Sequence, residues 1–472
     1  MLIDVAAILV TSVALTGLTG VSGAPERPVS SVTGSRVLAT ADSTATATAT
    51  ASPELARVTG STLATVTARV DADVLPTLRG RMLLDQLTLM TSRDIEAFLE
   101  GEPAAVAALL DNQPSARSVA TWWSIAPRSA QARLLQSAPE VVGNLDGVPP
   151  SVRDSANRRH LSESIDRVES LLDGLGRTER AEASQQLHML RQIEMAIVPS
   201  SSGPDRDLLS VDTEWPGRAA VVVGDLESAD YVSYMVPGMF FTTDRLIVDW
   251  TVIAEDLNTE QTAWIDRLSA TDPALLGATA ATVAWIGYET PGILDITSLD
   301  LAEEGAKRIG SAVDGLEVTR AGDEPFITLN THSYGSTATL MALADGSVEA
   351  DALVIIGSPG GAAQSVDDLG MSSDSVFVGE AAWDPVVHTA FFGSDPGSDS
   401  FGASSMNVGA QRDPVTGQAT AAAFGHLGYF DAGSTAMRNM ALVSIDRGDL
   451  VTDDRGETPV PGRREGSVRA SG

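Results

Sequence analysis

Residues 326–337 read Phe-Ile-Thr-Leu-Asn-Thr-His-Ser-Tyr-Gly-Ser-Thr, and this stretch decides the fold class. An apolar run ends at a turn around Ser333, and a helix-forming run follows it. This order is the context of the G-x-S-x-G nucleophile elbow, which holds a serine hydroxyl above the edge of a sheet. Gly335 lets strand and helix approach closely, whereas Thr331 stands where the motif has its first glycine. The alternative is an ordinary strand–turn–helix junction whose serine caps the helix.

A serine nucleophile needs a histidine base, which follows the serine and the acid in the chain order of such sites. Of the five histidines, only His388 and His426 come after Ser333. We assign His426 as the base, because it lies in a glycine-flanked loop after the last expected strand. His388 is the second choice. We expect it on the same short helix as the acid, from which it could not easily reach Ser333 as a separate arm. His332 adjoins the nucleophile, and its side chain is expected to point away from the site.

The predicted acid is Asp384, which lies in a turn after the second strand beyond the elbow. It follows Ser333 by 51 residues (384 − 333) and precedes His426 by 42 residues (426 − 384). Asp395 is the alternative acid, although it also fits a turn residue before proline, and Glu380 is a third choice. In these roles the histidine takes the serine proton, and the acid fixes the imidazole tautomer.

Two backbone amides are expected to stabilise the negative charge that develops on the substrate oxygen. The first is the N–H of Tyr334, directly after the nucleophile. The second is assigned to Met239, which follows Pro237-Gly238 at the end of an expected strand. Glycine there lets backbone amides approach a ligand, although this dipeptide also fits a plain turn.

Beyond residue 204, short β-branched runs alternate with helix-like stretches. The alternation predicts an α/β fold with a mainly parallel sheet covered on both faces. The expected strands are 219–223, 231–236, 282–287, 326–330, 352–356, 376–378 and 406–408, and the expected helices lie near 256–268, 298–314, 335–344 and 433–445.

The sequence before residue 204 predicts a helical region. One helix should carry an apolar stripe with steps of four, three and four residues, formed by Leu161, Ile165, Val168 and Leu172. We divide the chain into a candidate signal peptide (1–24), a disordered Ala/Thr/Ser-rich linker (25–52), the helical region (53–203), the catalytic domain (204–451) and a disordered tail (452–472).

The first segment carries mixed signals. Residues 5–21 are mostly apolar and precede a small-residue cleavage-like site, but no Lys or Arg comes before them and Pro25 follows directly. Its Thr and Gly residues argue against a stable membrane span. Cleavage would place the protein outside the cell or in the cell envelope, and retention of the segment would leave it in the cytoplasm.

Composition excludes several classes of function. The chain has no cysteine, which rules out disulfides, thiolate catalysis and cysteine-ligated metals. No two histidines have the spacing of a helical zinc pair, so no metal or other cofactor is expected. A net charge of −32 repels phosphate backbones and argues against nucleic-acid binding. The expected partner is a small ester or amide substrate.

Several segments look like the signature of a known family. They are Trp122-Trp123, Pro139-Glu140, residues 143–149 and 153–158, Val236-Pro237-Gly238-Met239, residues 332–336, Asp384-Pro385-Val386 and the His426 loop. Over roughly residues 120–446 the chain resembles the actinobacterial α/β-hydrolase family long catalogued as a domain of unknown function. The resemblance implies an α/β-hydrolase fold with an N-terminal helical extension and a triad of Ser333, Asp384 and His426. It implies no known substrate.

Two questions remain open at this level. The block 143–158 fits either a substrate-contacting cap or a hydrogen-bonded buttress between the helices and the hydrolase core, and Arg–Asp pairing favours the buttress. The leading function is hydrolysis of a carboxylic ester through an acyl-serine intermediate. The alternatives are a peptidase or amidase on the same scaffold, and a hydrolase-like protein that binds a ligand without catalysis.

Overall fold

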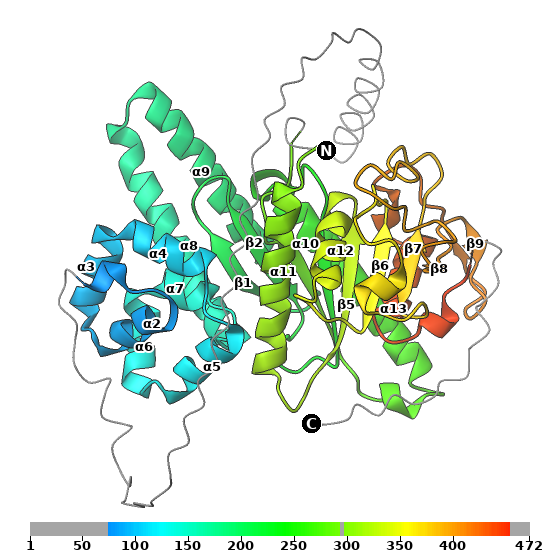
Figure 1. Ribbon diagram of the computed structural model, residues 1–472, viewed down its shortest axis with the longest axis horizontal. Coiled ribbons are helices and arrows are strands. Elements are labelled where there is room, and N and C mark those ends of the chain that lie inside the picture. Colours follow the sequence, from blue (N-terminus) through cyan, green and yellow to red (C-terminus); the bar gives the residue numbers. More distant parts are fainter. Residues whose placement is uncertain (1–73, 293–296, 454–472) are drawn as a thin grey trace, which may run out of the picture.

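The computed structural model describes residues 74–292 and 297–453 (Figure 1). The expected signal peptide, the expected linker and nearly all of the expected tail lie outside the described residues. Within the two described ranges, no helix is both long and apolar enough to cross a lipid bilayer.

The N-terminal part of the described chain is helical, as the sequence predicts. Its helices are α2 (Gly80–Leu89), α3 (Ser92–Gly101), α4 (Pro103–Asp111), α5 (Ala116–Ile125), α6 (Arg128–Ser137), α7 (Pro139–Asn144), α8 (Pro150–Leu171) and α9 (Arg177–Ala196). Helices α2–α7 surround a core of their own, which includes Leu84, Trp122 and Val141. They form the blue and cyan lobe of Figure 1.

Helix α8 joins this lobe to the rest of the molecule. Ala156, near its start, packs in the core of the lobe, whereas Leu161, Ile165 and Val168 pack in a core shared with the sheet. The predicted apolar stripe is therefore confirmed for these three residues. Leu172, the fourth expected member, begins a short 3-10 helix and is only partly buried.

The remaining chain builds an eight-stranded sheet in the order β1-β2-β4-β3-β5-β6-β7-β8. Strands β1, β2 and β4 pair antiparallel, and all pairs from β4 onward are parallel. The strands are β1 (Arg206–Asp212), β2 (Arg218–Val223), β3 (Tyr231–Val236), β4 (Ala280–Ile286), β5 (Phe326–His332), β6 (Ala352–Ile356), β7 (Val376–Gly379) and β8 (Ser404–Ser405), and a separate pair is formed by β9 (Gln411–Arg412) and β10 (Ala419–Thr420).

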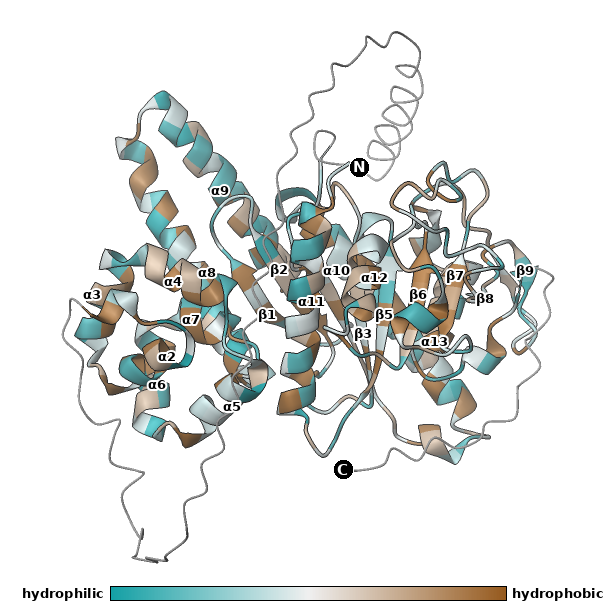
Figure 2. Cartoon of the chain, in the orientation of Figure 1, coloured by the Kyte–Doolittle hydropathy of each residue, from teal (hydrophilic) through white to brown (hydrophobic). Residues whose placement is uncertain are grey.

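Helices cover both faces of this sheet. They are α10 (Thr243–Leu268), α11 (Asp300–Thr319), α12 (Tyr334–Ala344) and α13 (Thr435–Val443), with 3-10 turns at Leu75–Thr77, Leu172–Gly174, Pro273–Leu275, Val366–Leu369, Gly428–Phe430 and Gly448–Leu450. Alternate strand residues enter two cores: Val221 packs with α10 and α13, and Val222 packs with α11 and α12. Burial on both faces explains the continuous apolar strands, and β6 and β7 are mostly brown in Figure 2. The expected covered sheet is confirmed.

The structure adds one strand that was not expected and corrects two expected elements. Strand β1 was not predicted, because a register shift between Leu208 and Ser210 breaks its apolar alternation. The segment 406–408 is not a strand: β8 ends at Ser405, and Met406 continues with a backbone hydrogen bond to Val378. The helix expected at 256–268 is the second half of α10, which begins at Thr243.

Candidate active site

Ser333 stands at the sharp turn between β5 and α12. Its φ of +54° is in the positive region that non-glycine residues rarely adopt, and its N–H donates to Ile356 O at 3.1 Å. A Cβ atom added to Gly335 would lie 2.4 Å from Pro237 O, so only glycine fits there. Thr331 is fully buried, and its hydroxyl donates to Val354 O at 2.9 Å on the neighbouring strand. The elbow therefore accommodates threonine at this position.

Ser333, His426 and Asp384 meet at the carboxyl edge of the parallel strands. His426 Nε2 lies 2.8 Å from Ser333 Oγ, and His426 Nδ1 lies 2.9 and 3.0 Å from the two oxygens of Asp384. The side chains of His426 and Asp384 are almost completely buried. When Nδ1 donates its proton to the carboxylate, Nε2 is left to accept the serine proton.

Asp384 is held by further donors. Tyr429 Oη donates to its Oδ2 at 2.7 Å, and the Val386 N–H donates to its Oδ1 at 2.9 Å. Burial alone raises the pKa of Asp384, but the hydrogen bonds from His426, Tyr429 and Val386 outweigh burial and bring its pKa below the ordinary value. The carboxylate is therefore ionised at neutral pH. Sequence reasoning missed Tyr429, because nothing in its local pattern shows a contact with a residue 45 positions away.

The sequence predicts that His332 points away from the site, and this prediction is wrong. Its ring lies 4.6 Å from the His426 ring, and its Nε2–H donates to the His426 carbonyl at 2.8 Å. Burial lowers the pKa of His332 to about 3, so its imidazole is neutral. The side chain thus packs against the back of His426 and holds the backbone of that loop.

The second-choice residues gather elsewhere on the surface. His388 Nδ1 lies 3.3 Å from both a Glu380 oxygen and an Asp395 oxygen. The helix expected around His388 is absent from residues 380–392, which are described throughout, and His388 has a φ of +62°. The ligand atoms of these three residues lie within 4.8 Å of one another, which makes them the group in the described chain that could hold a cation. The histidine that contacts the Ser333 hydroxyl is His426, not His388.

The loop after β3 lies against Ser333. A Cβ atom added to Gly238 would lie 2.4 Å from Ser333 Cβ and 2.9 Å from its Oγ. Met239 follows directly and is buried. Tyr334 is the first residue of α12, where the backbone N–H groups have no partner inside the helix and the helix dipole favours negative charge. Of the residues assigned as charge-stabilising donors, Tyr334 therefore follows Ser333 directly, and Met239 follows the glycine that lies against Ser333.

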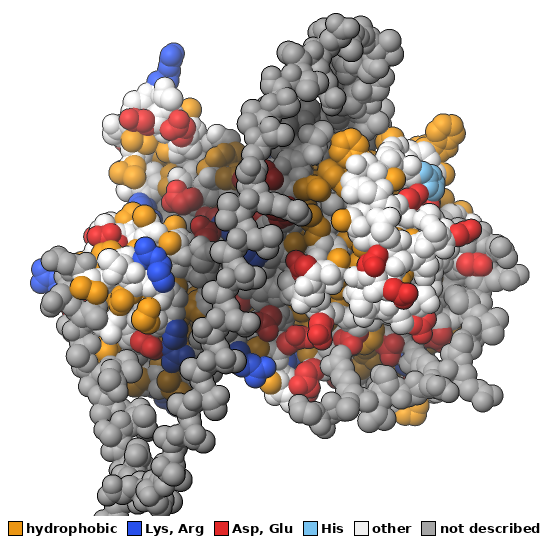
Figure 3. Space-filling view, in the orientation of Figure 1, with side chains coloured by type: hydrophobic (Ala, Val, Ile, Leu, Met, Phe, Trp, Pro, Cys, Tyr) orange, Lys and Arg blue, Asp and Glu red, His pale blue; other side chains and the backbone are white. Residues whose placement is uncertain are grey.

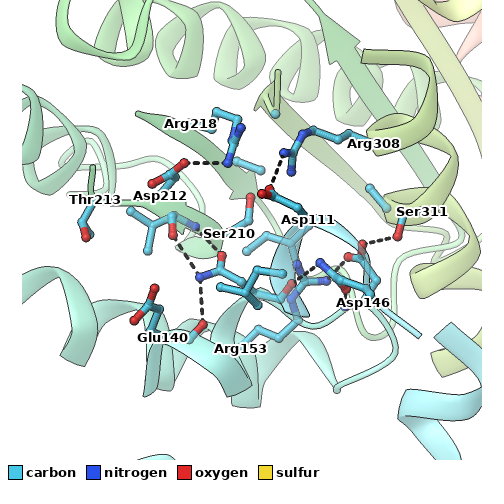
Figure 4. Close-up of a pocket in the computed structure, with 18 of the residues that line it drawn as sticks. Asp111, Glu140, Asp146, Arg153, Ser210, Asp212, Thr213, Arg218, Arg308 and Ser311 are labelled. Atoms are coloured by element: carbon cyan, nitrogen blue, oxygen red, sulfur yellow. Dashed lines mark hydrogen bonds and ion pairs between the residues drawn. The ribbon is translucent and has the colours of Figure 1, made fainter. Parts of the chain in front are cut away.

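A separate polar cavity of about 360 Å³ lies between the helical lobe, β1 and α11 (Figure 4). Ion pairs line it: Arg153 with Asp146 at 2.8 Å, Arg218 with Asp212 at 2.6 Å, and Arg308 on α11 with Asp111 on α4 at 3.1 Å. In the sheet, β2, β4 and β3 separate β1 from β5. The cavity is therefore distinct from the site around Ser333.

The block 143–158 forms one wall of this cavity and binds the outer edge of β1. The Asn144 side chain accepts from the Val211 N–H at 2.9 Å and donates to the Val211 carbonyl at 3.0 Å. Asp154 accepts from the Leu208 N–H at 2.7 Å, and Asn157 donates to the Leu208 carbonyl at 3.0 Å. These contacts agree with a buttress rather than with a substrate-contacting cap.

Comparison with known proteins adds the following relatives. Residues 212–394 match the model of a family described as alpha/beta hydrolase. The uncharacterized protein Rv2079 of Mycobacterium tuberculosis is 26% identical over 388 residues, which cover 72% of this chain and 57% of that protein. The chain thus spans little more than half the length of this relative. The uncharacterized protein Rv0963c of the same organism is 29% identical over 229 residues, 45% of this chain and 82% of that protein.

Solved esterase structures also align with the chain. Carboxyl esterase 2 from Tuber melanosporum matches with a TM-score of 0.31 and 13% identity, over 54% of this chain and 90% of its own. A thermostable esterase from Pseudomonas putida matches with a TM-score of 0.28 and 10% identity, over 61% of this chain and 96% of its own. The family match over residues 212–394, together with the mainly parallel sheet and its covering helices, confirms the expected α/β-hydrolase fold with an N-terminal helical region.

Proposed function

We propose that this α/β hydrolase cleaves a carboxylic ester through an acyl-serine intermediate. The observation that carries the proposal is the hydrogen-bonded series from Asp384 through His426 to Ser333, with 2.8 Å between His426 Nε2 and Ser333 Oγ. A serine hydroxyl is a weak nucleophile near neutral pH, and an adjacent imidazole base is the usual means of activating it. A buried carboxylate behind the imidazole completes the arrangement.

In the proposed first step, Ser333 Oγ bonds to the ester carbonyl carbon while its proton passes to His426 Nε2. The electron pair of the carbonyl moves to its oxygen, where the N–H groups of Tyr334 and Met239 would stabilise the charge. The intermediate collapses, and the bond to the alcohol breaks as His426 returns its proton to the departing oxygen. The acyl group is then bonded to Ser333.

In the second step, water takes the place of the serine hydroxyl. His426 removes a proton from the water as its oxygen attacks the acyl carbon, and it then protonates Ser333 Oγ as the carboxylic acid leaves. Asp384 stays ionised throughout and stabilises the imidazolium. The hydrogen bonds from Tyr429 and Val386 support this role, because they favour the charged carboxylate.

Paired substitutions test the assignment. We expect Ser333→Ala and His426→Gln to lower kcat for a p-nitrophenyl ester at least about a thousandfold, because each removes a group that takes part in the relay. His388→Gln serves as the control and should keep kcat within about twofold of the parent, because His388 pairs with Glu380 and Asp395 at the surface. The same assay with an aminoacyl p-nitroanilide tests the amidase alternative.

A loss of activity in His388→Gln with full activity in His426→Gln would overturn the proposal. Asp384→Asn and Asp395→Asn form a second pair, in which only the first should impair kcat. Circular dichroism of each variant checks that the fold is unchanged.

A further inference from the structure

Three large aromatic side chains are exposed on the loops that carry Asp384 and His426. Trp383, immediately before the acid, is 83% exposed; Phe424, two residues before the histidine, is 68% exposed; Phe391 is 57% exposed. Figure 3 shows hydrophobic side chains protruding at this end of the molecule, at its upper right. Among the described Trp, Phe and Tyr residues only Trp215 is also exposed, so three of the four cluster on these loops.

The exposed residues are connected to the two sides of the proposed site. Ala382 and Phe424 form an isolated β-bridge, and the Gly425 N–H donates to the Ala382 carbonyl at 3.0 Å. This pairing brings the loop of Trp383 and the loop of Phe424 together.

Phe391 is linked through ring contacts to Tyr334, the residue after Ser333. Its ring packs on Phe392 with centroids 4.8 Å apart, and Phe392 packs on Tyr334 at 5.4 Å. A continuous row of aromatic rings therefore runs from the residue after the nucleophile to the surface.

The conformation of Trp383 is unfavourable in the free protein. Its φ of +64° lies in the region that a bulky side chain rarely adopts. Its ring is left in water, although aromatic side chains gain most from burial against apolar groups. Strained backbone and exposed apolar clusters are both typical of ligand-binding surfaces.

We propose that Trp383, Phe391 and Phe424, here called the aromatic rim, bind the apolar acyl chain of the ester substrate. The inference rests on the proposed function and adds the substrate class. The substrates would be dissolved esters whose acyl chain has about eight carbons or more, since each methylene that the rim buries adds to binding. A single acyl chain fits better than a lipid surface, because a net charge of −32 opposes approach to an anionic membrane.

The test compares two ester chain lengths below the concentration at which either aggregates. The parent protein should have a higher kcat/KM for p-nitrophenyl octanoate than for p-nitrophenyl acetate. Trp383→Ala and Phe424→Ala should each lower the octanoate value about tenfold and leave the acetate value within about twofold, because the acetyl group is too short to reach the rim. Trp383→Phe, which keeps an aromatic ring, should restore most of the octanoate value.

Trp215→Ala is the matched control, since Trp215 is an exposed tryptophan outside these loops, and it should change neither value. Equal losses for both esters in Trp383→Ala would overturn the rim, because they would mean that the substitution only disturbs Asp384. A parent preference for acetate would also overturn it. The absence of octanoate hydrolysis below the aggregation concentration, followed by hydrolysis when the concentration is raised above it, would also overturn the rim and would indicate docking on a lipid surface instead.

Fluorophosphonates with ethyl and octyl chains separate this inference from the proposed function, because they report on Ser333 without ester turnover. Faster reaction of the octyl probe in the parent, lost in Trp383→Ala, supports the rim even if no ester is cleaved. Equal rates with both probes overturn the rim and leave the nucleophile in place. No reaction with either probe overturns the proposed function.

Discussion

Gly357 lies where the side chains of Asp384 and His426 meet. It follows β6 with a φ of +60°, and an added Cβ atom would lie 3.1 Å from both Asp384 Oδ2 and His426 Cε1. Both contacts are tighter than ordinary van der Waals separation. A side chain at this position would push the imidazole away from Ser333, so the geometry of the site depends on a residue with no reactive group.

We expect Gly357→Ala to lower kcat about a hundredfold with little change in KM, because a displacement of His426 by a fraction of an ångström weakens proton transfer more than substrate binding. Gly370→Ala is the control: its φ of +65° imposes the same backbone strain, and open space surrounds it. Both variants should lose about 1 kcal/mol of stability in urea unfolding. Equal kcat values for the two would refute the positioning role.

The sequence predicts the three residues of the proposed triad but not the residues that hold them in place. Ser333, Asp384 and His426 follow from chain order around a recognisable elbow. Gly357, Tyr429 and the orientation of His332 depend on contacts between loops far apart in the chain, and glycine and tyrosine have many ordinary reasons to occur. No local pattern separates a glycine in an open turn from one that borders a histidine.

At the scale of elements, the helical lobe protects a sheet edge. Strand β1 is the outermost strand, and its free edge is paired with side chains of α7 and α8 instead of another strand. An uncovered edge would offer unpaired backbone groups to other chains. The block 143–158 therefore has a structural reason for its dense set of Asn, Asp and Arg residues.

We expect Asn157→Ala to cost about 2 kcal/mol of unfolding free energy in urea, because it leaves the Leu208 carbonyl without its side-chain donor and the Gly143 carbonyl with only its hydrogen bond from Arg153. Arg159→Ala on the same helix removes only an exposed pair with Glu163 and should change stability by less than about 0.5 kcal/mol. Equal costs for the two variants would contradict the edge-binding role.

Elements with regular patterns were predictable, and irregular ones were not. The apolar runs of β2, β3, β5 and β6 stand out because both faces of the sheet are covered. Strand β1 was not predicted because its bulge places Leu208 and Val211, three residues apart, in the same core, which breaks the two-residue alternation of a regular strand. Residues 406–408 resemble a strand because they are apolar and buried at Met406 and Val408, yet β7 pairs with the two serines before them.

At the scale of the whole molecule, the lobe and the sheet meet through buried polar groups that respond to acid. His160 on α8 is buried, and its Nε2 lies 3.1 Å from Thr213 Oγ1 just after β1. Burial, with a smaller contribution from Arg167, lowers the pKa of His160 to about 4. The unfolded chain binds this proton more tightly than the folded chain, so stability falls as the pH drops through the window from about 6.5 to about 4.

Between about pH 7 and about pH 4.5, the free energy of unfolding should fall less in His160→Gln than in the parent. The difference between the two decreases should be about 2 kcal/mol, because glutamine has no proton to gain. Urea unfolding at a series of pH values measures the slope. His188→Gln, at an exposed histidine on α9, is the matched control for the loss of an imidazole outside the buried interface. A parallel pH dependence of His160→Gln and the parent would exclude His160 as a source of acid sensitivity.

The most direct test of Ser333 as an activated nucleophile is the mass of the folded protein after treatment with a fluorophosphonate, followed by peptide mapping. Ser333 Oγ should bond to phosphorus as fluoride leaves and the hydroxyl proton passes to His426, which adds one phosphonyl group to the peptide that contains Ser333. Ser333→Ala should gain no mass, and His426→Gln should react far more slowly. A folded parent protein that gains no mass, or that carries the adduct on another residue, would contradict the account.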